Sequence, residues 1–427
     1  MECLMKGNEM GVKDKIKRVM PQRIWNEIKS CTDKYYEGKM RKKCKLIEEF
    51  RPSESEFGVN LIGDIRAETG LGQSMRIIAD MLEQAGIPFL VRQMDAPDNI
   101  EHQERKWDHK IASESRYGIN LIHINNNVWK KNYNRIPIGE LSGRYNIAFW
   151  LWELEEFPDD WVSCIDTVDE IWTPSEFISR GLRKKTEKNV ITMPYGVVLD
   201  KSNLVGRKYF HLPEDKFLFL VMYDFLSISE RKNPYGVIKA YMRAFKKTDR
   251  GMGLVIKVNH LKKKTELDRL RAKLSGYPDI YFITDNLSRR EVESLIADAD
   301  VLVSLHRAEG FGLPLAEAMY LGTAVIATNW SSTTEFMDVD SACLVDYELV
   351  SLIKDIGPYR KGNRWADADV GHAAEYMREL FLDKEFYKRK VAGGEKYIKE
   401  CLDLEKMSDR VRGRMEEIYK GYKSENL

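Results

Sequence analysis

Residues 306–319 read HRAEGFGLPLAEAM and follow directly on an apolar run, VLVSLH (301–306). A short run that is apolar at nearly every position is typical of a strand buried on both faces of a parallel sheet. Pro314 suits the first turn of a helix, and Gly310 and Gly312 let the backbone come close to a ligand. Because the free amides at a helix start face an anion, the pattern predicts a strand, a phosphate-binding turn and a helix.

Two carboxylates flank this turn. Glu309 lies in the loop at the end of the strand and Glu317 in the first turn of the helix, so both can reach one cleft. A carboxylate there can orient sugar hydroxyls or stabilise an oxocarbenium-like centre. The alternative is a capped strand–helix turn with surface glutamates, because glycine-rich turns of this kind are common.

Apolar, strand-like segments alternate with helical patterns on both sides of this stretch. The first series has a helix at 73–85 and strands at 57–64, 88–92, 119–124, 146–151, 168–172 and 189–193. The second series has helices after Pro234 and at 265–274, and strands at 217–222, 252–258, 279–284, 301–306 and 323–328. Capping boxes at 288–291 and 332–335 predict two more helices, and the segment after Asp369 is helical to the end. Such alternation indicates parallel sheets.

A chain of 427 residues is too long for one core, and the two series divide near residues 196–212. The predicted fold class is α/β, with two facing doubly wound (Rossmann-like) sheets whose carboxyl ends meet across a cleft. The expected units are a basic helical extension (1–50), an N-terminal domain (57–200), a C-terminal domain (212–400) and a C-terminal helix (401–427).

The segment EGFGLPLAEAM (309–319) resembles the E-x7-E signature of the retaining family 4 glycosyltransferases, which have the GT-B fold. The resemblance extends over about residues 57–420. It implies an acceptor domain followed by a nucleotide-sugar donor domain, with Glu309 beside the donor sugar and Glu317 on the ribose hydroxyls. The turn and helix start that would meet the donor sugar and its phosphates comprise Gly310, Phe311, Gly312 and Leu313.

A basic pair, Arg231 and Lys232, stands just before a predicted helix. Cations there can neutralise a leaving diphosphate. Many members of the resembled family have an Arg five residues before this Lys, whereas this chain has Ser227, so Arg231 is the candidate substitute. The alternative is a solvated charge cluster, although positive charge at a helix start is unfavourable without an anion.

A second glycine turn, Gly70-Leu71-Gly72, follows the first strand of the N-terminal series. The third glycine of the dinucleotide fingerprint is missing, so position is better evidence here than the motif. The resemblance implies that this loop faces the donor phosphate and sugar. A tight strand–helix turn without ligand contact is the alternative.

Candidate acceptor or sugar contacts lie at two further strand ends. The segment FWLWELEEFP (149–158) offers Trp152 and Glu153, because aromatic faces and carboxylates can hold a sugar. The alternation of Trp150 and Trp152 also fits simple packing, which we expect for one of them. His123 ends another strand, where the resembled family often has a histidine near the sugar, although a lone histidine is more often structural.

No metal or other cofactor is expected. Metal-dependent transferases of the other major fold use D-x-D after a strand, but residues 298–300 precede a strand and residues 367–369 sit in a polar loop. The six cysteines are scattered, which argues against a disulfide framework or a thiolate zinc site. With a formal net charge of +1, the chain shows no global field for nucleic acid.

The first fifty residues carry an excess of five positive charges. Ile24, Ile28, Cys31 and Tyr35 form one helical stripe beside basic residues, as in helices that lie on anionic membrane surfaces. The alternative is a helix packed on the protein with a solvated basic face. Neither a secretory signal nor an apolar membrane span is visible, so the expected location is cytoplasmic, with peripheral contact at the inner membrane face.

The expected function is retaining transfer of a sugar from a nucleoside-diphosphate sugar to a glycan or lipid-linked acceptor. Catalysis would rest on Glu309, Lys232 and Arg231. Two other classes stay open: a non-catalytic sugar-nucleotide-binding protein, and a sugar-nucleotide epimerase or phosphorylase on the same fold. No pyridoxal-binding lysine motif supports a phosphorylase, and a mere binding module does not need Glu309.

Overall fold

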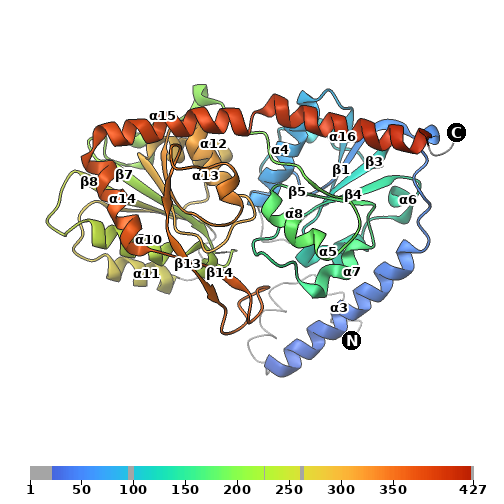
Figure 1. The fold of residues 1–427 in the computed structure, drawn as a ribbon, viewed down its shortest axis with the longest axis horizontal. Coiled ribbons are helices and arrows are strands. Elements are labelled where there is room, and N and C mark those ends of the chain that lie inside the picture. The colour runs from blue at the N-terminus through green and yellow to red at the C-terminus, as the bar shows by residue number, and fades with distance from the viewer. Residues whose placement is uncertain (1–21, 95–100, 226, 260–263, 425–427) are drawn as a thin grey trace.

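The computed structural model describes residues 22–94, 101–225, 227–259 and 264–424. It contains two six-stranded parallel sheets, one in each half of the chain, with helices packed around them (Figure 1). We refer to these halves as the N-terminal unit and the C-terminal unit. The doubly wound α/β fold expected from the sequence is thereby confirmed.

The sheet of the N-terminal unit has the strand order β2-β1-β3-β4-β5-β6. Its strands are β1 (Glu56–Gly63), β2 (Phe89–Gln93), β3 (Tyr117–His123), β4 (Tyr145–Phe149), β5 (Glu170–Thr173) and β6 (Val190–Thr192). The helices of this half are α3 (Gln22–Cys44), α4 (Gly70–Gln84), α5 (Asn126–Tyr133), α6 (Ile138–Leu141), α7 (Val162–Ile165) and α8 (Glu176–Arg183).

The sheet of the C-terminal unit has the order β12-β11-β10-β7-β8-β9. Its strands are β7 (Phe217–Asp224), β8 (Met252–Asn259), β9 (Ile280–Ile283), β10 (Val301–Ser304), β11 (Ala324–Thr328) and β12 (Cys343–Val345). Its helices are α9 (Ser229–Lys232), α10 (Pro234–Ala244), α11 (Lys264–Lys273), α12 (Arg289–Asp298) and α13 (Leu313–Leu321), followed by α14 (Val370–Leu382) and α15 (Lys384–Cys401).

Each sheet has one point at which the direction of winding reverses. In the N-terminal unit it lies between β1 and β3, and in the C-terminal unit between β7 and β10. At such a point neighbouring strands send their connections to opposite faces, which leaves a crevice outside their carboxyl ends. The loops after β1, β3, β7 and β10 therefore occupy the positions where ligands bind in sheets of this type.

Both sheets have apolar interiors, but one row of side chains in the first is polar. Asn60, Asn120 and Asn146 lie in register on β1, β3 and β4 and are almost completely buried. Their amides join into a chain, Asn60 donating to Asn120 and Asn120 to Asn146. Because each buried amide has partners, the row costs little in desolvation and fixes the register of three strands.

The sequence-based prediction of a helix at 332–335 is wrong. Residues Ser331–Glu335 form only a short 3-10 helix with no side-chain capping hydrogen bond. The Glu335 carboxylate instead accepts hydrogen bonds from the backbone amides of Glu176 and Phe177 in the other unit, so it caps α8. The box at Ser288 and Glu291 is confirmed at the start of α12.

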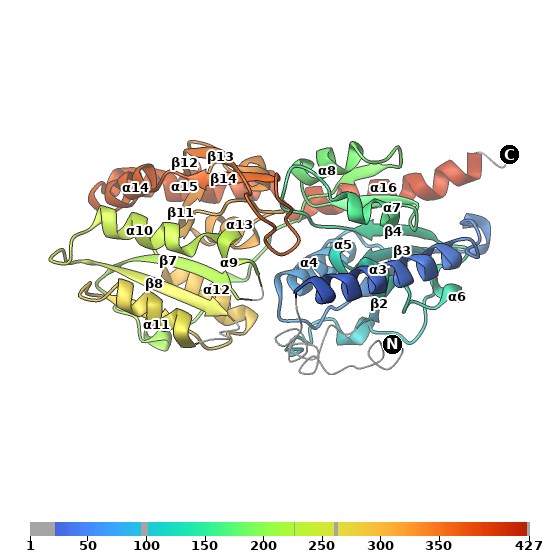
Figure 2. The same ribbon diagram turned by 90° about the horizontal axis from the view of Figure 1, so that it is seen from below.

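An antiparallel hairpin, not predicted from the sequence, is formed by β13 (Tyr347–Ser351) and β14 (Arg364–Ala368). This hairpin leaves the C-terminal unit and reaches toward the N-terminal unit (Figures 1 and 2).

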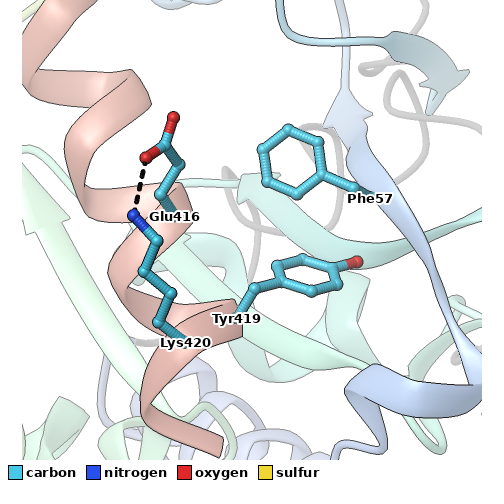
Figure 3. Close-up of a pocket in the computed structure, with 4 residues that line it drawn as sticks. All are labelled: Phe57, Glu416, Tyr419 and Lys420. Carbon is cyan, nitrogen blue, oxygen red and sulfur yellow. Dashed lines mark hydrogen bonds and ion pairs between the residues drawn. The ribbon is translucent and has the colours of Figure 1, made fainter. Parts of the chain in front are cut away.

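The C-terminal helices connect the two halves again. Helix α15 packs on α13, and α16 (Leu404–Ser424) packs on α4 of the N-terminal unit (Figure 1). A hollow between the start of β1 and α16 is lined by Phe57, Glu416, Tyr419 and Lys420 (Figure 3). It lies at the amino end of β1, opposite the edge where ligands are expected.

Helix α3 packs on the N-terminal unit through one side only. Met40 is fully buried, and Lys43 donates to the carbonyl oxygen of Tyr133 at the end of α5. The predicted stripe faces away from this contact: Ile24, Ile28 and Tyr35 have exposed fractions of 45%, 39% and 51%, and Cys31 is also exposed. Within the described ranges, no helix combines the length and apolarity that crossing a bilayer requires.

Candidate functional site

Three predicted residues of the C-terminal unit come together at its switch point: Arg231, Lys232 and Glu309. Arg231 and Lys232 end the single-turn helix α9 after β7, and Glu309 lies in the loop after β10. Asn233 follows in the left-handed conformation (φ 50°), and its side chain donates to the carbonyl oxygen of Leu305. This hydrogen bond ties the loop after β7 to the loop after β10 and so brings the two motifs side by side.

Glu309 is buried, with an exposed fraction of 7%, and both cations contact it. Its Oε1 forms an ion pair with Lys232 and lies 3.1 Å from Nη1 of Arg231. Burial alone would raise the pKa of Glu309, but Lys232 and Arg231 outweigh burial and lower it to about 2. Glu309 is therefore ionised at any physiological pH.

Two serines after β11 hold the backbone of Glu309. The Ser331 hydroxyl accepts from the Glu309 amide at 3.0 Å, and the Ser332 hydroxyl donates to the Glu309 carbonyl at 2.7 Å. The carboxylate is thus fixed through its main chain as well as through its ion pairs.

The guanidinium of Arg231 is enclosed by partners. It donates to the carbonyl oxygen of Ala308 at 2.8 Å and to the Ser227 hydroxyl at 3.1 Å, and lies 3.7 Å from Glu153 of the N-terminal unit. Arg231 thus contacts Ser227, which stands at the position where the resembled family has an arginine. Its side chain is 8% exposed, whereas that of Lys232 is 25% exposed. Of the two cations, Lys232 is the freer to turn toward an incoming anion.

The glycines of the turn at 310–312 are packed closely against protein atoms. Gly312 has φ 95°, and a Cβ there would lie 2.6 Å from Thr333. Gly310 is packed so that a Cβ would lie 3.2 Å from the backbone oxygen of Trp152 in the other unit. Gly312 is the N-cap of α13, which begins at Leu313 and has Pro314 in its first turn, so the amide-bearing end of this helix opens at the switch point.

Glu317 sits in a separate cluster with two residues of α12. Its Oε1 lies 2.6 Å from Nη2 of Arg289, whose Nε is 2.7 Å from Glu293. Burial would lower the pKa of Arg289, but Glu317 and Glu293 raise it, so this arginine stays charged. One cation thus serves two carboxylates, and the local balance is negative.

In the N-terminal unit, Gly72 is required by the backbone, because a Cβ there would lie 2.0 Å from the carbonyl oxygen of Ala67. Its amide donates to the Thr69 hydroxyl, which caps α4. Gly70 and Leu71 are exposed at the carboxyl end of β1. The turn is thus tight at Gly72 and open at its other two residues.

His123 ends β3 next to that turn, and its exposed fraction is 6%. Its Nε2 forms a 2.7 Å hydrogen bond with the Ser74 hydroxyl, which also contacts the hydroxyl of Tyr195. Burial lowers the pKa of His123 to about 4, so the ring is neutral. Tyr195 in turn packs edge-on against Phe311, with ring centroids 4.7 Å apart. His123 is therefore linked through Ser74 and Tyr195 to residues 309–312, which we call the EGFG turn.

Trp150 and Trp152 are both buried, with exposed fractions of 0% and 3%, although packing was expected for only one of them. The indole of Trp152 donates to the carbonyl oxygen of Glu156. Glu153 of this segment reaches the other unit, where it meets Arg231 and the hydroxyl of Tyr359.

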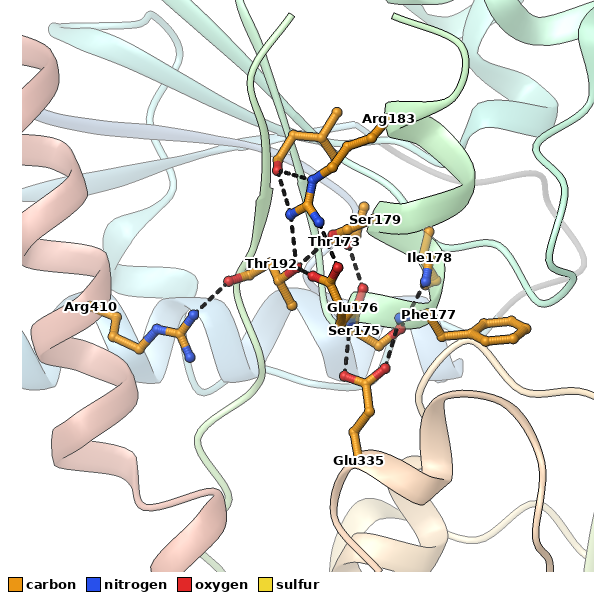
Figure 4. A network of polar contacts seen from close by, with 11 residues as sticks. Thr173, Ser175, Glu176, Phe177, Ile178, Ser179, Arg183, Thr192, Glu335 and Arg410 are labelled. Atoms are coloured by element: carbon orange, nitrogen blue, oxygen red, sulfur yellow. Dashed lines mark hydrogen bonds and ion pairs between the residues drawn. The ribbon is translucent and has the colours of Figure 1, made fainter. Parts of the chain in front are cut away.

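The two units touch around the start of α8. Ser175 caps this helix and donates its hydroxyl hydrogen to the carbonyl oxygen of Gly310 at 3.1 Å. The carboxylate of Glu335 accepts from the amides of Glu176 and Phe177 at 2.8 and 2.7 Å (Figure 4). The EGFG turn is therefore in direct contact with the N-terminal unit.

The two D-x-D sequences have structural roles. Asp300 forms an ion pair with Arg207, Asp367 pairs with Arg307, and Asp369 caps α14. Among the described residues, no group of three or more His, Cys, Asp or Glu side chains is arranged to hold a metal ion.

Sequence reasoning missed Ser331, Ser332, Arg289 and Tyr359 as neighbours of the predicted carboxylates. Ser331 and Ser332 follow the predicted strand 323–328, so their place at its carboxyl end was a usable signal. Arg289 and Tyr359 carry no such signal, because a capping box and a polar loop do not reveal which side chains they will meet.

Residues 208–341 match the model of the family described as glycosyl transferases group 1. The O-antigen biosynthesis glycosyltransferase WclY of Escherichia coli is 28% identical over 179 residues, which are 42% of this chain and 45% of that protein. The chain thus matches under half the length of this curated relative.

Two solved structures share the overall fold. A glycosyltransferase from Rickettsia africae has a TM-score of 0.61 and 14% identity, with 85% of this chain and 99% of the other covered. Anabaena HepE, solved in complex with UDP and glucose, has a TM-score of 0.59 and 11% identity over 84% of this chain and 100% of HepE. Residues 208–341 are therefore similar to the glycosyl transferases group 1, and the chain as a whole has the GT-B type of fold seen in these solved structures.

Proposed function

We propose that this protein is a retaining glycosyltransferase that moves a sugar from a nucleoside-diphosphate sugar to a glycan or lipid-linked acceptor. The observation that carries the proposal is the cluster of Glu309, Lys232 and Arg231 at the switch point of the C-terminal unit. A carboxylate held ionised beside a partly exposed lysine and a helix start suits a sugar that develops positive charge while its diphosphate departs.

In the proposed reaction, the bond between the anomeric carbon and the diphosphate oxygen breaks, and a bond from that carbon to an acceptor hydroxyl oxygen forms on the same face. The hydroxyl proton passes to the departing phosphate oxygen. Lys232 turns from Glu309 to the diphosphate, the amides of the EGFG turn and of α13 bind its oxygens, and Glu309 supports the positive sugar ring. Arg231 stays within the cluster and keeps Glu309 in place.

Glu317 is proposed to accept hydrogen bonds from the ribose hydroxyls, and Gly70 and Leu71 to lie over the donor from the N-terminal unit. His123, Glu153 and Trp152 remain the candidates on the acceptor side. The cations of the chain offset the diphosphate charge in this scheme, so no metal takes part, and we expect the rate to be unchanged by EDTA.

The first test is the melting temperature in the presence of GDP, UDP, dTDP, ADP or CDP. A ligand at a hundred times its Kd adds about 2.7 kcal/mol of stability, which raises the melting temperature of domains of this size by roughly 5–10 °C. UDP is included because it is bound in the HepE structure. One stabilising nucleotide identifies the donor base, whereas no shift with any of the five contradicts a donor site.

The second test is stereochemical. With the matching α-linked donor and a glycan acceptor, the product is expected to be α-linked, as measured by the anomeric proton coupling in NMR. A β-linked product would contradict retention, and release of a free epimerised sugar nucleotide would favour the epimerase alternative.

The outward side of α3 is proposed to contact an anionic membrane surface, which would bring the enzyme to a lipid-linked acceptor from the cytoplasmic side. Its exposed stripe of Ile24, Ile28, Cys31 and Tyr35 is bordered by exposed Lys34 and Lys39. Ile28→Glu is expected to reduce co-sedimentation with phosphatidylglycerol vesicles. Leu382→Glu, at an exposed apolar residue of α14, is the matched control, and equal binding by both variants would rule out this surface.

A further inference from the structure

The hairpin of β13 and β14 bridges the two units through three polar contacts, two from its loop and one from the start of β14. Arg360 pairs with Asp160 at 2.7 Å, Arg364 with Glu155 at 3.0 Å, and the Tyr359 hydroxyl donates to Glu153 at 3.1 Å. All three partners lie in the segment after β4, which holds the candidate acceptor contacts. The hairpin therefore lies against the acceptor side of the site (Figure 2).

The base of the hairpin is fixed to the C-terminal unit. Arg307 pairs with Asp367 at 2.8 Å, and the carbonyl oxygen of Arg307 accepts from the amide of Ala366 at 2.9 Å. Arg307 comes two residues before Glu309, and its amide donates to the carbonyl oxygen of Arg231 at 2.7 Å. The same short segment thus supports both the hairpin and the cluster around Glu309.

Of the three bridging contacts, only the one made by Tyr359 is buried. The two ion pairs have side chains that are 33–64% exposed, and exposed pairs contribute little. Tyr359 is 2% exposed and packs against Trp152 and Trp365, with ring centroids 5.4 and 6.2 Å away. Burial raises the pKa of Tyr359, so its hydroxyl remains a proton donor to Glu153.

From Glu153 the contacts continue to the sugar site. Glu153 Oε1 lies 3.7 Å from Nη2 of Arg231, and Nη1 of Arg231 lies 3.1 Å from Glu309. The two carboxylates that flank Arg231 come from different units, so the position of its guanidinium depends on how the units meet. Tyr359 fixes the Glu153 end of this chain of contacts.

We propose that Tyr359 is a positioning residue for the transfer reaction: it holds Glu153 against Arg231, which keeps Glu309 aligned with the donor sugar once the two units have closed. This role rests on the proposed function. This role also accounts for the burial of Arg231, in a chain that has Ser227 where the resembled family has an arginine. Arg231 orients Glu309 and does not bind the diphosphate.

The test is Tyr359→Phe, which removes one hydroxyl and keeps the aromatic packing. We expect kcat to fall about tenfold, equivalent to about 1.4 kcal/mol, while the donor KM and the nucleotide-induced rise in melting temperature stay unchanged. Tyr209→Phe is the matched control, because Tyr209 also donates its hydroxyl to a glutamate, Glu291, on an exposed surface. When Tyr359→Phe is added to a Glu153→Gln variant, kcat should not fall further.

A Tyr359→Phe variant with the kcat of the Tyr209→Phe control would overturn the role of Tyr359 while leaving the proposed function intact. A rise in donor KM at unchanged kcat would do the same, because it would place Tyr359 in donor binding. Absence of transfer by the wild-type protein with every donor would instead overturn the proposed function, and the role of Tyr359 with it.

Discussion

Glu309 and Glu317 stand eight residues apart in one signature, yet their surroundings differ in charge. Around Glu309, two cations (Arg231 and Lys232) face two carboxylates, the second being Glu153. Around Glu317, a single cation, Arg289, is shared with the carboxylate of Glu293. The first cluster is neutral and contains a partly exposed lysine, whereas the second is negative and its Arg289 is shared between two carboxylates.

Under the proposed function, this difference suits the two carboxylates to different parts of a donor. A diphosphate needs positive charge and amides, which only the first cluster offers, beside the start of α13. Neutral hydroxyls need acceptors, which the excess carboxylate of the second cluster supplies. The proposal therefore gives one residue type two roles at two positions of one motif, because the neighbours differ.

Glu309→Gln should give the largest effect. It keeps the shape of the side chain and removes the charge opposite the sugar, so kcat should fall on the order of 10²–10³-fold. Because the cluster then gains a net positive charge, binding of the nucleoside diphosphate should not weaken. Steady-state kinetics and calorimetry measure the two quantities.

The control for this variant is Glu395→Gln, which removes a surface carboxylate of α15. Near-normal turnover by Glu309→Gln would break the assignment of the first cluster. Weaker nucleotide binding with normal turnover would reverse the roles of the two glutamates.

Glu317→Gln should have a smaller and different effect. Losing a charged acceptor for the ribose hydroxyls costs about 1.5–3 kcal/mol, so the donor KM should rise roughly 10–100-fold with little change in kcat. Arg289 keeps Glu293 as its partner, so the fold should tolerate the change.

Dideoxyribose analogues sharpen this second prediction. The wild-type protein should bind the 2′,3′-dideoxy nucleoside diphosphate more weakly than the normal one, and Glu317→Gln should bind the two almost equally. If the variant still discriminates between them, Glu317 does not hold the ribose.

The smallest expected effect is a loss of folding stability in acid, which originates beside the first cluster at His306. His306 lies at the end of β10, and burial lowers its pKa to about 4 from 6.5. Since the folded-state pKa is the lower one, the stability from this group is complete above pH 6.5 and is lost as the pH falls toward 4. Between pH 7 and 5.5 the loss is about 1 kcal/mol.

Thermal unfolding across this pH range provides the measurement. His306→Asn should flatten part of the slope, whereas His211→Asn, at an exposed left-handed position that asparagine tolerates, should leave it unchanged. If stability falls equally steeply with pH in both variants, the protonation of His306 does not cause the loss of stability in acid.

Much of the fold was predictable because the strands of both sheets are apolar at nearly every position. The predicted strand 252–258 is β8 (Met252–Asn259), and the helix expected at 265–274 is α11 (Lys264–Lys273). The hairpin of β13 and β14 was not predictable in this way, because it lies outside both sheets and its strands are short and partly exposed. The failed helix at 332–335 shows the same limit, since Glu335 is used by the neighbouring unit.

By itself, the sequence determined the two parallel sheets and the glycine turn at 310–312. These features depend on local periodicity and on the rule that loops at the carboxyl ends of strands meet at one edge. Only the tertiary structure decided which cation serves which carboxylate, because Arg231, Arg289 and Tyr359 meet their partners across elements far apart in the chain. Pairing in a buried site depends on distance and desolvation, and a linear pattern contains neither.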